Sequence, residues 1–546
     1  MTPRLRATIV LAVATGVLTG LAVALFDRIV GTGVFDHLLD APLWVQAAAP
    51  VAGLVLATVI MRTVGRGASG ATADEYLKDF HDTEGHLDLR PVPARVLASA
   101  ATLGSGGAMG FEGPSIYIGA AIGSWLQRRA ARVLPRGDGK LLLVCGAAAG
   151  VAAIFKAPAT GMVFALEVPY QHDLARRMLL PAMFASASSY LVFAAINGTD
   201  ALFPVGGAAP FDLRDLGGAA ALGLLAGVGA RALAWLLRAA KTAAIERSPY
   251  VRLPAAGVGI VLVFAATRGL TGESLSIGSG YGAISWALQP GHALATVLGV
   301  FALRAAATTL AVGGGGVGGL FVPLVVQGAL LGGAMSVAVH APDPTLFPLL
   351  GVAAFLGAGY RVPLAAVMFV AETTAQPGFL VPGLLAAATS QLLMGRTSVS
   401  AYQLPTRVGL LERRLALPIT AALRADAATV PPDATLVELL EHHMTTLRLR
   451  TLPIVDEAEH YYGMAHLDDI VAVPREEWTS TPVARIVRTD APTAAITWTL
   501  TQAARAMEGA DIDRIAVLDG EAFVGIVTIR EVLELDAILE QTEGPG

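Results

Sequence analysis

Charge, cysteine and histidine are all scarce in this chain, and each scarcity excludes a class of protein. Charged residues make up 15% of the 546 positions and hydrophobic residues 54%, which is typical of a polytopic membrane protein. The single cysteine, Cys145, excludes disulfides within the chain. The membrane region contains no His-x-x-x-His, Cys-x-x-Cys or Gly-x-Ser-x-Gly pattern. We therefore expect no metal site and no enzyme, and a net charge of −5 gives no sign of nucleic-acid binding.

Long uncharged runs, such as Ala7–Phe26 and Pro42–Met61, are expected to span the bilayer, and several others are too short or too broken to cross simply. The first run has no small-residue cleavage site and continues into further apolar segments, so we interpret it as a retained helix. Arg4 and Arg6 before it favour a cytoplasmic N-terminus.

Glu112 stands alone in one of these stretches. No Lys, Arg, Asp or other Glu lies between Arg95 and Arg128. A charge at the bilayer centre costs roughly 2.5–3.5 kcal/mol on insertion scales, so this carboxylate is expected to face a pathway, a partner or a proton instead of lipid. Its neighbours are two glycines and a proline, in the order Gly110-Phe111-Glu112-Gly113-Pro114.

Residues 95–123 repeat at 304–332, shifted by 209 positions. The shift aligns Arg95 with Arg304, Gly104 with Gly313, Gly110 with Gly319, Pro114 with Pro323, Gly119 with Gly328 and Gly123 with Gly332. A second pair lies at nearly the same offset: Lys156-Ala157-Pro158 precedes Glu167, and Arg361-Val362-Pro363 precedes Glu372 at the same spacing. The membrane region is therefore predicted to consist of two homologous halves, roughly 1–200 and 201–410.

Both repeats place a helix start beside glycine, at Gly110-x-x-x-Pro114 and Gly319-x-x-x-Pro323. Free N–H groups at such a start aim a partial positive charge at whatever lies there. Two opposed helix ends can hold a dehydrated anion without a full positive charge, which would bind it too tightly to release. We expect Glu112 to occupy the anion position when ionised and to leave it when protonated.

The composition changes near Leu415. From there charged residues are frequent. The tail also contains a two-fold repeat, in which Leu452-Pro453-Ile454-Val455-Asp456 is matched by Ile515-Ala516-Val517-Leu518-Asp519. Each match follows a helix-like stretch and precedes a short glycine-led apolar run. The tail is therefore predicted to be one soluble domain made of two βαββα-like units.

These residues resemble the CLC family of chloride channels and proton-coupled chloride exchangers, with a C-terminal pair of CBS modules, over nearly the whole chain. Residues 110–114 are similar to the family's G-x-E-G-P motif, which carries the gating glutamate, and residues 319–323 to its G-x-F-x-P motif. Residues 68–72 resemble the segment whose serine touches the central anion, and residues 400–402 the segment whose tyrosine completes that site. The resemblance implies Glu112 as gate and proton acceptor, with an anion site formed by Ser69, Gly113, Leu320, Phe321 and Tyr402.

The departures from the family pattern bear on selectivity and coupling. Thr72 replaces a proline at the first segment, which puts the geometry of that helix end in doubt, whereas Ser69 resembles chloride-preferring members. Intact Pro114 disfavours the fluoride-exporting branch. Exchangers carry a proton-relaying glutamate directly after the position of Glu167, and Val168 stands there in this chain.

Simpler roles exist for several of these residues. By itself Ser69 is more often a helix cap, Tyr402 an interfacial anchor, and Glu167 a structural cap or pairing partner. Basic residues on both sides of 141–167 predict a re-entrant hairpin that turns at Lys156. Lys156 reaches polar backbone in the simpler interpretation. In the alternative it tunes Glu112 and, with Glu167, forms a proton or electrostatic relay.

The tail's resemblance to CBS modules implies regulation, with an adenine nucleotide as a possible ligand near Asp469, Thr528 and Glu531. The simpler interpretation is a packing or dimerisation module. No cofactor is otherwise required.

The sequence thus predicts an all-α polytopic membrane protein with two inverted-topology repeats and broken, re-entrant helices over residues 1–415, followed by a C-terminal α/β tandem CBS domain over 416–546, with units about 416–475 and 480–540. The expected function is chloride transport gated by a protonatable glutamate, either as a channel or as a proton-coupled exchanger. The alternative is a CBS-regulated carrier for another ion or a small organic anion. Expected partners are chloride, protons, the lipid bilayer of the inner membrane and a second copy of the chain, with both termini cytoplasmic.

Overall fold

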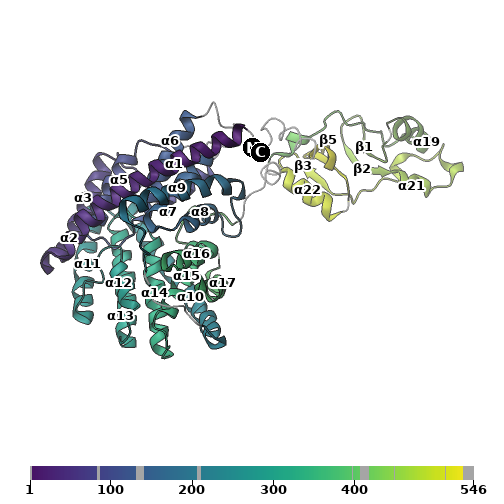
Figure 1. Ribbon diagram of the computed structural model, residues 1–546. Coiled ribbons are helices and arrows are strands. Elements are labelled where there is room, and N and C mark those ends of the chain that lie inside the picture. Colours follow the sequence, from purple (N-terminus) through teal and green to yellow (C-terminus); the bar gives the residue numbers. More distant parts are fainter. Residues whose placement is uncertain are drawn as a thin grey trace. The chain divides into compact units, whose positions relative to one another are not determined.

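The computed structural model describes residues 3–82, 87–130, 140–203, 205, 211–395, 397–405, 417–447, 449–510 and 512–532. The chain forms two compact units, residues 1–407 and 408–546, and each is described by itself (Figure 1). The predicted boundary at 415/416 lies in residues 406–416, outside the described residues.

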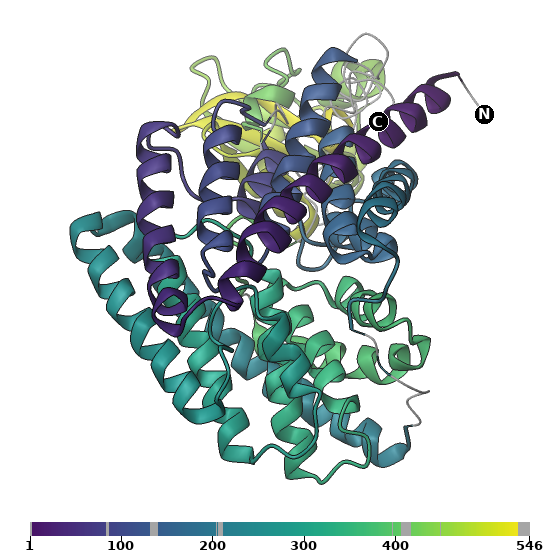
Figure 2. The same cartoon turned by 60° about the vertical axis from the view of Figure 1, so that its left-hand side comes forward.

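The first half of the larger unit is built from helices that begin and end where glycine, proline or charge interrupts the apolar runs. These are α1 (Pro3–Asp27), α2 (Asp36–Leu39), α3 (Leu43–Thr63), α4 (Ala73–His81), α5 (Val92–Gly104), α6 (Glu112–Arg129), α7 (Leu141–Phe155), α8 (Pro158–Glu167) and α9 (Leu179–Asn197), with a π-helical segment η1 (Arg28–Phe35) and a 3-10 turn η2 (Arg176–Met178). Helix α1 packs against α6, α7 and α9 and crosses them diagonally in Figure 2.

The second half has the same order of helices. These are α10 (Leu213–Glu246), α11 (Pro249–Thr271), α12 (Tyr281–Ala287), α13 (Leu294–Gly313), α14 (Phe321–Ala338), α15 (Leu346–Tyr360), α16 (Pro363–Thr374) and α17 (Leu380–Met394), with a 3-10 turn η3 (Pro377–Phe379). Helices α6 and α14 both contain 18 residues, and α7 and α15 both contain 15. Helices α11, α13 and α14 stand side by side in Figure 1. The larger unit therefore has the repeated architecture that the sequence predicts.

Eight helices within the described part of the chain are long and apolar enough to cross a membrane. Helices α7 and α15 are shorter, and every one of their residues is buried in protein. Each ends at a residue in the left-handed region, Lys156 with φ of 52° and Arg361 with φ of 57°. A proline then starts the next helix two residues later. The predicted break at Lys156 is present, and the second repeat has its equivalent.

Glycines let the broken helices approach each other closely. A Cβ on Gly119 of α6 would lie 2.0 Å from the carbonyl oxygen of Gly146 in α7. A Cβ on Gly328 of α14 would lie 2.3 Å from the carbonyl oxygen of Gly351 in α15. Backbone contact between small residues is the usual way in which membrane helices pack, because lipid offers no hydrophobic force between them. The two repeats use equivalent glycines for it.

The smaller unit is α/β. Its elements are η4 (Ile419–Ala422), α19 (Leu436–Glu438), η5 (Leu439–Met444), α20 (Thr445–Leu447), β1 (Thr451–Val455), β2 (Tyr461–His466), α21 (Leu467–Val471), η6 (Arg475–Glu477), η7 (Val483–Arg485), β3 (Thr493–Ala495), α22 (Leu500–Gly509), β4 (Arg514–Asp519) and β5 (Ala522–Thr528). Strands β1 and β2 pair antiparallel, whereas β4 pairs parallel with β3 and antiparallel with β5. Each sheet has its own hydrophobic core, as two repeated modules require.

Candidate anion site

The two repeats meet at their equivalent glycines. The N–H of Gly110 donates to the carbonyl of Gly319 at 2.9 Å, and the N–H of Gly319 donates back to Gly110 at 2.7 Å. Such a reciprocal antiparallel bridge between equivalent residues indicates a local two-fold axis. The starts of α6 and α14 are thereby brought together. Pro114 and Pro323 occupy the third position of each helix, where the N–H that proline lacks would have no acceptor within the helix. The N–H groups of the residues before each proline can therefore bind another group.

Glu112 is the first residue of α6, and its side chain reaches across this axis into the other repeat. It is fully buried, with an exposed fraction of 0%. The N–H of Phe321, the first residue of α14, donates to Glu112 Oε1 at 2.6 Å. Glu112 Oε2 has no hydrogen-bond partner among the described residues. The carboxylate therefore lies at the start of α14, where the sequence predicts that an anion binds.

The space around this carboxylate exists because glycines surround it. A Cβ on Gly110 would lie 1.8 Å from Glu112 Oε2, and a Cβ on Gly319 would lie 1.9 Å from Glu112 Oε1. A Cβ on Gly113 would lie 2.5 Å from the backbone nitrogen of Gly319. A side chain at Gly110 or Gly319 would collide with the carboxylate, and one at Gly113 would collide with the backbone of the other repeat.

No full positive charge compensates Glu112 within the described part of the chain. Arg95 is held by Glu75 at 3.2 Å and by the Tyr117 hydroxyl, and Arg304 donates to backbone carbonyls between residues 275 and 279. The negative charge is instead stabilised by the partial positive charge of the helix start. This arrangement can exchange one anion for another, because no fixed cation holds either one tightly.

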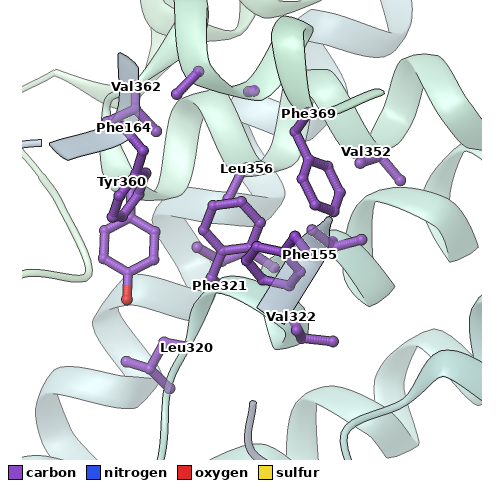
Figure 3. Close-up of a cluster of buried hydrophobic side chains, with 14 of the residues drawn as sticks. Phe155, Phe164, Leu320, Phe321, Val322, Val352, Leu356, Tyr360, Val362 and Phe369 are labelled. Atoms are coloured by element: carbon purple, nitrogen blue, oxygen red, sulfur yellow. The ribbon is translucent and has the colours of Figure 1, made fainter. Parts of the chain in front are cut away.

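An aromatic cluster fixes the start of α14. The Phe321 ring lies 4.6 Å from Phe155, 5.4 Å from Phe164 and 5.0 Å from Phe369, between ring centroids. These three partners come from α7, α8 and α16 (Figure 3). Each such pair adds about 0.5–1.5 kcal/mol beyond burial. The predicted site residue Phe321 is therefore also a packing residue of both repeats.

The structure places two other predicted anion ligands differently. Ser69 is exposed, and its Oγ accepts a hydrogen bond from Ala71 N at 3.1 Å, as a turn cap does. The Tyr402 side chain is 43% exposed. Neither makes a hydrogen bond with the start of α14 in the described part of the chain. A role for them as ligands of the anion stays a prediction.

Two buried hydroxyl groups near the site were not singled out from the sequence. Thr72 is buried, and its hydroxyl donates to the carbonyl of Gly318 at 3.2 Å. Its position was noted only as a departure from proline. Tyr360 is 3% exposed and lies beside Phe321. Its only sequence signal is its place directly before the repeated Arg361-Val362-Pro363 segment.

The family model for voltage gated chloride channels matches residues 52–395. The chain belongs to this family. The CBS domain model matches the tail twice, at residues 419–476 and 483–537. A putative chloride channel protein, ClcB-like, from Ralstonia nicotianae is 28% identical over 369 residues, which cover 64% of this chain and 82% of the relative.

Solved CLC structures share the fold. A slow cyanobacterial Cl−/H+ antiporter aligns with a TM-score of 0.63 at 23% identity, covering 73% of this chain and 96% of that one. A eukaryotic CLC transporter aligns with a TM-score of 0.62 at 19% identity, covering 96% and 98%. This chain is therefore a multi-pass CLC membrane protein with a CBS pair.

In this CLC chain, Glu167 and Glu372 cap helices of the opposite repeat. Glu167 ends α8, and its carboxylate accepts hydrogen bonds from Leu364 N at 3.1 Å and Ala365 N at 2.8 Å, at the start of α16. Glu372 lies in α16 and accepts from the N–H groups of Ala159 and Thr160, at 2.8 and 2.7 Å, at the start of α8. The structure gives both glutamates a capping role, which is the simpler interpretation of Glu167. A relay function of Glu167 stays a prediction.

Lys156 lines a cavity of about 630 Å³ that also reaches Phe111, the residue before Glu112. The Lys156 Nζ donates to the carbonyls of Asn197 and Asp200, at 3.2 and 3.3 Å. The lysine thus binds polar backbone, as the simpler interpretation holds. An influence on Glu112 stays a prediction.

The residues predicted to hold a nucleotide in the tail are engaged elsewhere. Asp469 forms a bidentate pair with Arg488, at 2.7 and 2.8 Å, and this hydrogen bonding raises the pKa of Arg488. Thr528 and Glu531 hydrogen-bond to each other in a capping arrangement. A separate polar cavity of about 310 Å³ is lined by Leu449, Arg450, Thr451, His466, Leu467, Asp468, Asp513 and Arg514. Burial lowers the pKa of His466 there.

Proposed function

We propose that this chain transports chloride across a membrane, through a pathway whose anion site is the start of α14 and whose gate is Glu112. The observation that carries this proposal is the Glu112 carboxylate itself, fully buried and bound to Phe321 N at 2.6 Å. A helix start that stabilises the protein's own anion can stabilise a mobile one once the carboxylate is protonated and leaves.

The size of the site selects the kind of anion. A Cβ on Gly110 or on Gly319 would lie less than 2 Å from a carboxylate oxygen of Glu112, so the space holds the carboxylate group and no further side chain. A halide or another small inorganic anion can replace the carboxylate there, whereas an organic anion requires more room. The carrier for organic anions is therefore disfavoured.

Two mechanisms are compatible with this geometry. In a channel, Glu112 only opens and closes the pathway. In a proton-coupled exchanger, it also carries a proton, and a second group must connect it to the other side of the membrane. Val168 cannot serve as that group, so coupling would depend on Lys156 or Glu167. The relatives' names cover both mechanisms, a channel in Ralstonia and an antiporter in the cyanobacterium.

The proposal extends to the surroundings of the pathway. We place the protein in the inner membrane as a homodimer, with its N-terminus and its CBS pair in the cytoplasm. We assign the CBS pair a regulatory role, with an adenine nucleotide as the candidate ligand. Asp468 and Asp513 line the polar cavity together with Arg450 and Arg514, and Arg514 pairs with Asp513 at 3.0 Å. Arg450 is therefore the group that would supply positive charge for a phosphate.

The test is the reversal potential of the purified protein in liposomes under opposed chloride and pH gradients. A channel reverses at the chloride potential alone, and an exchanger at a potential set by both gradients. The Glu112→Gln variant has a permanently neutral side chain, so we expect its chloride flux to be independent of pH and free of proton coupling.

The matched control is Glu372→Gln, which changes a carboxylate of the same unit that is engaged in capping. It should keep the wild-type response to pH. A Glu112→Gln protein whose flux still follows pH would refute Glu112 as the gate. A wild-type protein that carries no anion flux would refute the function.

A further inference from the structure

Tyr360 presents a buried hydroxyl group at the start of α14. It is the last residue of α15, and its ring joins the aromatic cluster, 5.6 Å from Phe164 and 6.5 Å from Phe321. The side chain is 3% exposed. Figure 3 shows that the hydroxyl leaves the cluster and points toward Leu320, the residue directly before α14.

A buried hydroxyl without a hydrogen bond costs free energy, so its surroundings indicate its use. The hydroxyl end of Tyr360 lies beside Leu320 at the start of α14 (Figure 3). A phenol oxygen can accept a hydrogen bond, and its proton can be donated at the same time. Phenol groups carry such a polar end on a rigid apolar ring. The Tyr360 O–H is thus presented beside Leu320, next to the Phe321 N–H that binds Glu112.

We propose that Tyr360 contacts the transported anion, donating its O–H to an anion held at the start of α14 beside the Leu320 N–H. This inference rests on the proposed function and adds a ligand to its site. The family resemblance implies Tyr402 as the tyrosine ligand, but that residue is 43% exposed. The two segments are neighbours, because Gln403 Nε2 donates to the Tyr360 carbonyl at 2.8 Å.

The hydroxyl also determines selectivity. A hydrogen-bond donor at a fixed position stabilises a compact anion more than one whose charge is spread over several atoms, since the Coulomb energy falls with distance. Removing the Tyr360 hydroxyl should therefore weaken chloride binding more than thiocyanate binding.

The decisive variant is Tyr360→Phe, which removes the oxygen and keeps the ring that packs against Phe164 and Phe321. The matched control is Tyr402→Phe, which removes the exposed hydroxyl of the neighbouring segment. Chloride binding is measured by calorimetry on the purified full chain, and chloride over thiocyanate selectivity by reversal potentials in liposomes. We expect Tyr360→Phe to weaken chloride binding about fivefold to tenfold, the effect of one hydrogen bond, and to lower the selectivity ratio. Tyr402→Phe should change neither quantity by as much.

The outcomes separate this inference from the function on which it rests. If wild-type protein neither binds nor carries chloride, the proposed function is wrong. If wild type does both and Tyr360→Phe matches it in affinity and selectivity, the inference is wrong and the function stands. If Tyr402→Phe alone shows the loss, the ligand is Tyr402. Should Tyr360→Phe fail to fold, Tyr360→Met removes the same hydroxyl with a flexible side chain that fills the space, and the same losses are expected.

Discussion

At the scale of single residues, the anion site depends on the space that the missing Cβ atoms of its glycines leave open. Gly110 lies beside the Glu112 carboxylate, and its backbone is not in the left-handed region. A glycine is therefore needed there because it has no Cβ, and not because its backbone is more flexible. Alanine is therefore compatible with the backbone at this position. The three atoms nearest to such a Cβ all belong to the Glu112 carboxyl group, at 1.8 to 2.6 Å.

We predict that Gly110→Ala displaces the Glu112 carboxylate from the start of α14 without changing any titratable group. The displaced carboxylate can no longer compete with chloride, so flux should respond much less to pH, as in Glu112→Gln. Liposome flux at acidic and alkaline pH measures this.

Gly217→Ala is the control, since nothing lies within 4 Å of the Cβ that it adds. It should leave the pH response as in wild type. A Gly110→Ala protein with the full wild-type pH response would show that the carboxylate does not need this space.

The sequence is sufficient to single out Glu112 and to align Gly110 with Gly319, because a lone charge in an apolar run and a glycine repeated at constant offset are visible without tertiary information. That the two glycines bond to each other is visible only in the structure. Tyr360 and Thr72 are different. Their importance comes from the turn after α15 and from the approach of residue 72 to the second repeat, and neither approach has a local pattern. Polar residues that act through tertiary contacts are the ones that a motif cannot find.

At the scale of elements, the two repeats stabilise each other by exchanging caps. Helices α8 and α16 both start with a proline and a free N-terminal turn, and each receives a carboxylate from the end of the other. The equal spacing from proline to glutamate predicted the equivalence of these glutamates, but only the fold shows that each one reaches across to the opposite helix.

We predict that Glu372→Ala lowers the free energy of unfolding by about 2 kcal/mol, because a carboxylate that accepts from Ala159 N and Thr160 N is a charge-assisted cap. Glu372→Gln should cost less, since the amide oxygen can still accept. Thermal unfolding of the purified protein in detergent measures both variants. Equal stability of Glu372→Ala and wild type would mean that the cap contributes nothing.

At the scale of the whole molecule, the chain separates a membrane unit that holds the candidate anion site from a CBS unit. Glu112, Phe321 and Tyr360 all lie in residues 1–407. The hydrophobic cores of the tail contain only residues from 417 onward. Composition alone predicts this division, since charge becomes frequent near Leu415. Composition does not predict which polar residues of the tail meet, and Asp469 consequently pairs with Arg488 instead of standing free for a ligand.

We predict that a chain ending at residue 415 assembles in the membrane and keeps its anion flux, because its core and its site belong to the larger unit. Regulation should change instead, and any response to an adenine nucleotide should disappear. Flux per protein in liposomes, with and without nucleotide, compares the truncated and full chains at matched protein density. A truncated protein that elutes as a single species but carries no flux would contradict this, and would make the CBS pair a part of the transport mechanism. Equal flux with a lost nucleotide response is the expected result, and it would place the nucleotide site in the tail, where Arg450 lines the polar cavity.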